Sequence, residues 1–339
     1  MANIKDLVTA NSVGAYWDNF PSDQALLGEM LFPNERIIGD DATWLKGSNN
    51  GAIGLSIASY DTNVLELSRG EFEKITSSIP FFKNSMTVNE KLRSELNRVL
   101  KYGDEKMRDV LLNRIFNDTL TLRRNADVRI ERMRWEAITT GRLNISENGV
   151  NFVLDYKMPA ENKVTPTTSW GSTGANPIAD LNAWKLKMSA VGKTVSRAFM
   201  NSITYNKMVQ SVAAKYVVAS TMLPTATVEQ YIKTETGLTF YVYDGAYKAV
   251  DGTIVKYIED NIVVLAPAVA LGSTMFGTTP EESDLMSDNA ANVYVTDPGI
   301  TVTAYGTVDP VAHIIKASMV TAPSFPEVDN VIVATVVNG

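Results

Sequence analysis

Cysteine is absent from the sequence, and histidine occurs once, as His313. Without cysteine the chain can form no disulfide framework, no cysteine-ligated zinc site and no thiol nucleophile. One histidine cannot supply a histidine cluster for a metal ion, or the spare histidines of a nucleophile network. His313 lies between Ala312 and Ile314 in a predicted strand, and we therefore interpret it as a packed or surface residue.

Long hydrophobic runs are also absent. The longest apolar run extends from Ile262 to Leu271, which is far short of the roughly 20 residues that span a bilayer. We interpret this run as a buried strand that ends near Pro267. The first residues, Met-Ala-Asn-Ile-Lys-Asp, contain no apolar core of signal-peptide length. The sequence therefore predicts no membrane partner.

Positive charge is scarce, with 31 Lys and Arg residues against 38 Asp and Glu residues and a net charge of -7 at pH 7. A protein that grips nucleic acid by its phosphates is normally basic, so any contact with DNA should be weak and nonspecific. The one dense basic group comprises Arg123, Arg124, Arg129, Arg132 and Arg134. Asp127 and Glu131 lie among them. Charge pairs along a solvated helix face, salt bridges to a neighbouring subunit and loose contact with DNA are the alternative interpretations.

Motifs for catalysis are missing as well. The segment Gly192-Lys193-Thr194 resembles the end of a phosphate-binding loop, but Lys187 occupies the position where the motif requires a glycine. The adjacent acids Asp40-Asp41 and Glu281-Glu282 lie in predicted loops, where carboxylates are usually solvated. We therefore expect no enzyme activity, no catalytic residue, no cofactor and no metal site.

The proportions of hydrophobic and charged residues are those of a globular protein. The chain has 339 residues, of which 45% are hydrophobic and 20% charged, and this balance excludes disordered and fibrous classes. A chain of this length can build more than one core. A mixture of helical and strand patterns predicts an α+β fold with at least two lobes.

The first 50 residues combine many turn-forming residues with scattered apolar ones, and neither helical nor strand periodicity is strong. We interpret this segment as an arm whose apolar side chains are buried against something outside its own lobe. In particular, we expect Leu27, Leu31 and Phe32 to pack against a neighbouring subunit. The alternative is that the segment wraps over its own domain.

Residues 51–86 are predicted to form a long β-hairpin that projects from the body. The runs 53–57 and 64–67 are strand-like, and turn-forming residues separate them. Few residues of the segment could form a core. We therefore expect it to lie over an adjacent subunit, with the contact made by Arg69, Glu71, Glu73 and Lys74.

Two helices are predicted next. A capping-box pattern at residues 87–90 begins the first helix, which ends at Gly103. Asp104 caps the second helix, in which apolar residues recur at spacings of three, four or seven as far as Gly141. The second helix would contain roughly 36 residues and extend about 54 Å, far beyond the average helix. Such a length suits a spine that crosses an extended subunit.

The remainder of the chain alternates between helices and strands. Helices are predicted from Asn176 to about Gly192, from Thr204 to Ala219, and from a second capping box at Thr227 to Gly237. Strands are predicted over residues 150–158, 238–243, 254–258, 262–265, 292–296, 301–305, 313–319 and 330–337.

A family resemblance is carried by stretches spread over most of the chain. They include LLGEMLFP at 26–33, WEAITTG at 135–141, NPIADL at 176–181, DNIVVLAP at 260–267 and LGSTMFGTTPEE at 271–282. In their order and spacing these stretches resemble the lambda-type major capsid proteins of tailed bacteriophages, the major capsid protein E family.

The resemblance implies the Hong Kong 97-type capsid fold. It also implies a major head protein that self-assembles, as homo-pentamers and homo-hexamers, into an icosahedral shell around double-stranded DNA. The parts of the fold would be an N-terminal arm (1–50), an extended loop (51–86), a peripheral domain (87–175 and 306–339) that includes the spine helix (104–141), and an axial domain (176–305).

Partners and location follow from the same resemblance. The protein would be a virion component that is assembled in the bacterial host cytoplasm and meets a portal and a decoration protein. Because the arm begins within a few residues of Met1, a separate scaffolding protein is expected. Some relatives cross-link lysine to asparagine; Lys74 and Lys83 lie in the loop region, but no motif identifies a cross-linking set, and we expect a noncovalent shell.

Three other functions are considered. An encapsulin-like nanocompartment shares the fold but encloses enzymes instead of DNA, and it is the nearest alternative. A metabolic α+β enzyme would need a convergent polar pocket, for which the sequence supplies no residues. A tail-tube or adaptor protein is disfavoured by the long helix.

Overall fold

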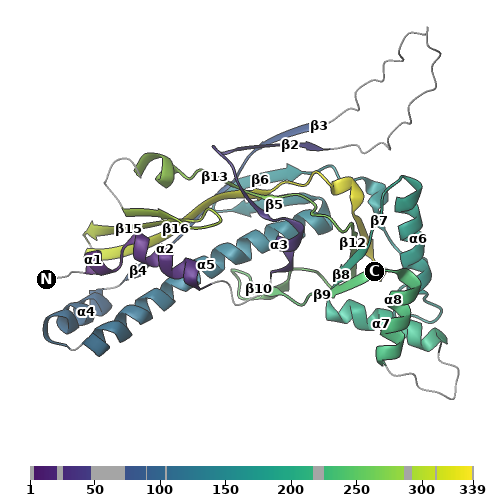
Figure 1. The fold of residues 1–339 in the computed structure, drawn as a ribbon, viewed down its shortest axis with the longest axis horizontal. Helices are drawn as coiled ribbons and strands as arrows, with labels where there is room; N and C mark the ends of the chain where they lie inside the picture. The colour runs from purple at the N-terminus through teal and green to yellow at the C-terminus, as the bar shows by residue number, and fades with distance from the viewer. Residues whose placement is uncertain are drawn as a thin grey trace, which may run out of the picture. The chain divides into compact units, whose positions relative to one another are not determined.

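The computed structural model describes residues 4–20, 26–46, 73–88, 90–103, 105–216, 225–285, 292–309 and 311–337 (Figure 1). The chain divides into two compact units, each made of three segments. Unit 1 comprises Met1–Ala42, Thr76–Arg134 and Ser273–Ser324, and unit 2 comprises Thr43–Ile75, Trp135–Gly272 and Phe325–Gly339. Both units combine helices with a sheet, as the predicted α+β class requires.

Unit 1 is built on a six-stranded sheet. Its strands lie in the order β1 (Asn34–Arg36), β13 (Thr274–Gly277), β16 (Val311–Pro323), β15 (Thr301–Val308) and β14 (Asn292–Val295), and β4 (Phe81–Val88) also pairs with β16. The 13-residue strand β16 pairs antiparallel with β13, β15 and β4, so it is the centre of the sheet. Only β1 is parallel to its neighbour among the described pairs of this sheet.

One face of this sheet packs on helices. Alternate residues of β16, namely Ile315, Ala317 and Met319, join one buried cluster with Leu96 of α4 (Glu90–Tyr102) and Ile115 of α5 (Glu105–Thr140). The alternation follows from the two-residue period of a strand, which sends every second side chain to the same face. The core of unit 1 therefore lies between the sheet and these two helices.

The long helix is confirmed. Helix α5 contains 36 residues, and its apolar residues enter the core at the predicted helical spacings. Gly141, directly after the helix, has φ +74°, and its N–H donates to the carbonyl of Ala137 at 2.9 Å. This is the left-handed end for which glycine is favoured. The helix begins in unit 1 and ends in unit 2.

Unit 2 has a five-stranded sheet in the order β7 (Lys163–Val164), β17 (Ile332–Thr335), β12 (Ile262–Ala266), β8 (Arg197–Met200) and β9 (Thr239–Val242). Helices α6 (Pro177–Ala190), α7 (Ser202–Tyr216) and α8 (Thr225–Thr236) share a buried cluster with β8, β12 and β17. The strand predicted at 262–265 is β12, the central strand of this sheet. Two ribbons complete the unit: β5 (Arg142–Glu147) with β6 (Val150–Asp155), and β10 (Ala246–Lys248) with β11 (Ile254–Lys256).

The N-terminal segment differs from the predicted arm. It forms helices α1 (Ile4–Leu7), α2 (Ala10–Asn19) and α3 (Leu27–Leu31). Ile4, Val8, Val13 and Trp17 are buried in the core cluster of unit 1. The prediction of an arm that buries its apolar residues outside its own lobe is therefore wrong for these residues, and the alternative of a wrap over the same domain describes them correctly.

The limits of the projecting hairpin also need correction. Residues 47–72, which include both predicted strand runs, lie outside the described residues. Strands β2 (Asp41–Lys46) and β3 (Glu73–Ser78), which flank them in sequence, pair with each other. Residues 81–86 belong instead to β4, which pairs with β16 inside unit 1, so the predicted loop ends too late.

Two predicted helix starts are wrong. Thr87 pairs with Ile314 in the sheet, so it cannot cap α4. Helix α8 begins at Thr225 and already contains Thr227. A capping-box pattern needs only two residue types at the right spacing, and here the strand pairing and the earlier helix start override it.

The predicted domain limits do not coincide with the two units. The proposed axial segment 176–305 includes β13, β14 and β15, but these strands pair within the sheet of unit 1. The proposed peripheral segments include β17, which pairs with β12 and β7 in unit 2. Long-range strand pairing decides both assignments.

Candidate functional site

A buried ion pair lies on α5 inside unit 1. The carboxylate of Glu131 is 3.5 Å from the guanidinium of Arg134, and the two side chains are only 0% and 2% exposed. Glu131 also accepts a hydrogen bond of 2.9 Å from the backbone N–H of Gly28. Arg134 donates to Thr274 on β13 at 2.8 Å and to Asn34 on β1 at 2.7 Å. The pair therefore fastens α3, β1 and β13 to the long helix.

Burial shifts the pKa of two charged side chains on this part of the helix. It lowers the pKa of Arg134, while the neighbouring carboxylates of Glu131 and Glu29 oppose that change. Burial likewise raises the pKa of Asp127, against the opposing charge of Arg123. Charges that are paired in this way join neighbouring elements and offer no free acid or base.

Four arginines of the basic group are candidates for a subunit contact, and they are not equivalent: Arg123, Arg124, Arg129 and Arg132. Arg123 pairs with Asp127 at 3.2 Å, four residues along the helix. Arg129 lies over the ring of Phe82, at 5.1 Å from its centroid. Arg132 is half-buried, and Arg124 is exposed. The interpretation as a helix face with i,i+4 pairs describes Arg123, and Arg124 is the one of the four with a largely exposed side chain.

The three apolar residues predicted at a subunit interface, Leu27, Leu31 and Phe32, also differ in how exposed they are. Leu31 and Phe32 are each 0% exposed in the single chain, so they have no surface left for a neighbouring subunit, and that prediction is wrong for both. Leu27 is half-buried. Arg69 and Glu71 lie outside the described residues, and Glu73 and Lys74 belong to β3.

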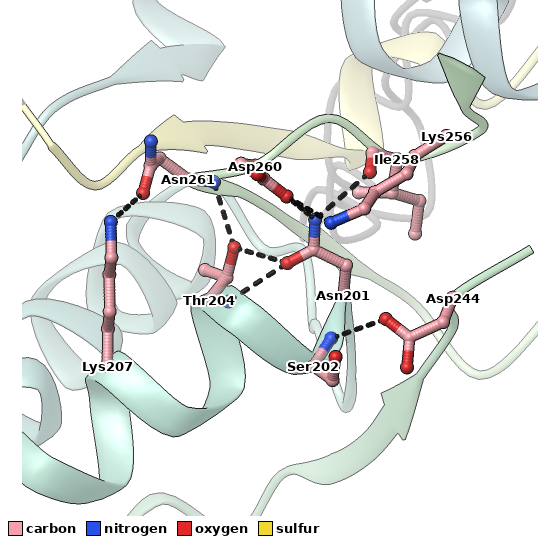
Figure 2. Close-up of polar contacts among 9 residues, drawn as sticks. All are labelled: Asn201, Ser202, Thr204, Lys207, Asp244, Lys256, Ile258, Asp260 and Asn261. Atoms are coloured by element: carbon pink, nitrogen blue, oxygen red, sulfur yellow. Dashed lines mark hydrogen bonds and ion pairs between the residues drawn. The ribbon is translucent and has the colours of Figure 1, made fainter. Parts of the chain in front are cut away.

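Unit 2 contains a polar network where α7 begins (Figure 2). Asn201 precedes the helix, and its Oδ1 accepts hydrogen bonds from the N–H and the hydroxyl of Thr204 at 2.9 and 2.8 Å. This is the arrangement of an asparagine N-cap. The amide group of Asn201 donates to Asp260 at 2.6 Å, and Lys207 donates to Asn261 at 2.6 Å. The network thus joins α7 to the turn before β12.

The carboxylates of this network, Asp244 and Asp260, accept hydrogen bonds from neighbouring residues. Asp244 accepts a bond of 2.8 Å from the N–H of Ser202 at the start of α7. The hydrogen bond from Lys256, at 2.7 Å, lowers the pKa of Asp260, and Asn201 contributes in the same direction. Both acids accept hydrogen bonds from donors of the network, which positions a helix without presenting a reactive group.

The remaining candidates from the sequence have structural contacts. Lys193, from the phosphate-loop-like segment, donates to the carbonyl of Asp329 at 3.1 Å. His313 is buried in β16 and lies 2.8 Å from the carbonyl of Val8. Within the described ranges, no group of three His, Cys, Asp or Glu side chains is placed to hold a metal ion. The same residues include no helix of the length and apolarity that a membrane span requires.

Large apolar side chains are exposed at turns, and sequence reasoning missed them. Ile38, in the bend after β1, is 99% exposed; Val250, at the tip of the β10–β11 ribbon, is 105% exposed; and Val308, at the β15–β16 turn, is 88% exposed. The signal that could have found them is an apolar residue inside a turn sequence, as in Val250-Asp-Gly and Val308-Asp-Pro. Such side chains are candidate contacts between molecules.

Comparison with solved structures identifies the fold. A protein described as a prophage capsid protein of E. coli CFT073 superposes with a TM-score of 0.61 at 14% identity, covering 97% of this chain and 99% of that one. A phage-related protein of Bordetella bronchiseptica RB50 gives 0.57 at 12% identity, with 98% and 97% covered. The cyanophage A-1(L) capsid gives 0.53 at 11% identity, with 95% and 96% covered. The predicted Hong Kong 97-type capsid fold is confirmed.

Sequence comparison identifies the family. No curated protein sequence matches the chain. The family model described as phage major capsid protein E matches residues 9–298, which is most of the chain and includes parts of both units. That family consists of structural capsid proteins and is not an enzyme family. With its fold and most of its length matched, the chain belongs to the phage major capsid protein E family.

Proposed function

We propose that this chain self-assembles as homo-pentamers and homo-hexamers into the icosahedral shell that encloses phage double-stranded DNA. The observation that carries the proposal is the family match over residues 9–298. Exposed Ile38, Val250 and Val308 support it, because apolar side chains at turn tips gain free energy when a second copy covers them. The shell is noncovalent in this proposal.

The contacts between copies include the segment around β3. We propose that Arg69, Glu71, Glu73 and Lys74 meet an adjacent subunit, as their charged and turn-rich sequence surroundings favour. Leu27 and the four arginines Arg123, Arg124, Arg129 and Arg132 form a second proposed contact, with the exposed Arg124 as its leading member. Each exposed pair is worth less than about 1 kcal/mol, so repetition over many copies supplies the stability.

Other partners follow from the same role. A separate scaffolding protein guides assembly in the bacterial host cytoplasm, and a portal and a decoration protein join the particle. Packaged DNA touches the shell weakly and nonspecifically, since a chain with a net charge of -7 cannot supply a dense cationic surface for phosphates. The protein catalyses no reaction and needs no cofactor.

Electron microscopy and size-exclusion chromatography of the purified chain test the proposal. We expect shells, capsomers or sheets far larger than the 37.1 kDa monomer, either alone or after co-expression with a scaffolding protein. Samples are compared at low and high salt, because exposed charge pairs are screened over about 10 Å at 0.1 M salt. A stable monomer at high concentration under every one of these conditions would contradict self-assembly.

A further inference from the structure

Residues 4–20 are held on the rest of unit 1 by buried apolar side chains, among them Val8 and Val13, and by a few hydrogen bonds. Trp17 on α2 is buried, and its indole N–H donates to the hydroxyl of Thr119 on α5 at 3.0 Å. Tyr294 on β14 donates to Asp18 at 2.9 Å. Between α1 and α2, the carbonyl of Val8 faces the ring of His313 on β16. Residues 4–20 are therefore a strap across the unit, and His313 is the only titratable side chain of β16 that bonds to it among the described contacts.

The proton on His313 has a defined position. Nε2 lies 2.8 Å from the carbonyl oxygen of Val8, and a carbonyl can only accept, so the neutral ring carries its proton on Nε2. Nδ1 is buried and has no hydrogen-bond partner among the described residues. A neutral ring tolerates this, because Nδ1 is then an acceptor only. In the protonated ring Nδ1 becomes a donor that lacks an acceptor.

The surrounding charges do not favour a second proton. Gly306 is the cross-strand partner of His313, and a Cβ placed on Gly306 would lie 3.0 Å from the ammonium nitrogen of Lys5 on α1. The other charges on packed elements are engaged or point to solvent. On α4, Arg93 donates to the carbonyl of Val311 and lies 3.9 Å from Glu90, and Asp6 on α1 is exposed. Burial, together with Lys5, lowers the pKa of His313 despite the bond to Val8.

We propose that His313 is a proton-sensitive latch, and that its protonation releases the strap formed by residues 4–20 from unit 1. The ring itself cannot move out easily, because β16 pairs with β15 on one side and with β4 on the other at this position. Within the strap, α1 is the part that can yield first, since it contains only four residues. Its departure gives the protonated ring water as the acceptor for Nδ1. This device is a property of the single chain and does not depend on shell formation.

Hydrogen–deuterium exchange on the purified full-length chain tests the latch, with labelling times corrected for the intrinsic effect of pH. We expect peptides within residues 4–20 to be protected at about pH 7.5 and to lose protection at about pH 5, well below the ordinary pKa of a histidine. Peptides from β12 in unit 2 serve as the internal control and should change little. Retained protection of residues 4–20 at the lower pH would overturn the proposal.

Two variants separate His313 from other acid effects. His313→Gln keeps an amide donor for Val8 but cannot be charged, so its strap should stay protected at both pH values; equal loss in this variant and the parent would refute the latch. Lys5→Gln leaves the histidine in place and removes the nearby charge, so the acid-induced loss should become smaller. Lys91→Gln, an exposed lysine on α4, is the matched control and should behave as the parent does. A Lys5 variant with the parent's full loss would also count against the proposal.

Discussion

Glu131 and Arg134 are charged side chains that unit 1 buries almost completely. Moving both charges out of water is costly, and the pair is tolerated because its oxygens and N–H groups meet partners on α3, β1 and β13. Removal of one member therefore lowers the free energy of unfolding by more than the net contribution of the pair to stability. It leaves the other side chain buried without this ion-pair partner.

Arg134→Met should lower the free energy of unfolding by about 3–5 kcal/mol, because the buried carboxylate of Glu131 loses the guanidinium beside it. Urea denaturation of the unassembled chain measures this loss. Arg124→Met, on an exposed position of the same helix, is the matched control and should stay within about 0.5 kcal/mol. If the two substitutions cost the same, the buried pair does not have the role assigned to it.

His313 should make stability depend on pH. Its pKa is lowered from 6.5 in the folded chain, mainly by burial, so the unfolded chain binds a proton more readily than the folded one. The contribution is therefore present above about pH 6.5 and decreases as the pH falls from that value toward the folded pKa. The difference in urea midpoint between the parent and His313→Gln, measured over this range, should vary with pH. A constant difference would contradict the assigned direction.

At the level of elements, the end of α5 is fixed by Gly141. Its φ of +74° lies in the left-handed region, and an added Cβ would meet the Cβ of Met158 at 2.6 Å. Backbone conformation and packing thus both require glycine at this position. Strand β5 of the β5–β6 ribbon begins at Arg142, directly after this glycine.

Gly141→Ala should lower stability by about 1–3 kcal/mol through strain and overpacking together. Gly149 provides the control, since its φ is +78° but nothing lies within 4 Å of an added Cβ. Gly149→Ala should therefore cost only the backbone strain, about 1 kcal/mol. Thermal unfolding of both variants separates the two contributions, and equal losses would show that the contact with Met158 is relieved without cost.

For the whole molecule, each unit has its own sheet and core, yet both expose apolar side chains at turns. Val308 belongs to unit 1, and Val250 belongs to unit 2. A monomer gains nothing from these side chains, whereas an assembled shell can bury them. The proposed assembly therefore buries apolar side chains that folding of the single chain leaves exposed.

Val250→Asp and Val308→Asp should each reduce the yield of assembled particles while leaving the unassembled chain folded, with its free energy of unfolding changed by no more than about 0.5 kcal/mol. An aspartate placed in an apolar contact must be desolvated without a partner. Sedimentation velocity and circular dichroism measure the two properties. Ser189→Asp, at an exposed polar position on α6, is the control. Normal particle yield in both valine variants would exclude these turns as contacts.

The sequence by itself determined the elements whose information is local. The 36 residues of α5 are encoded by the spacing of apolar residues every three or four positions and by the glycine that ends the helix. The continuous apolar residues at 262–265 predict a buried strand, and Pro177 marks the first turn of α6. The family resemblance depends on similar short stretches in a fixed order.

Only the tertiary structure decided which elements belong together. Strand β16 pairs with β4, which lies far before it in the chain, and this pairing moved residues 81–88 from the predicted loop and helix cap into a core sheet. Trp17, Leu31 and Phe32 look like an arm in the sequence because no local period shows what covers them, yet unit 1 buries all three. The ion pair of Glu131 and Arg134 likewise gains its partners from β1 and β13. Burial and strand pairing join residues that are distant in sequence, and a local pattern carries no information about those partners.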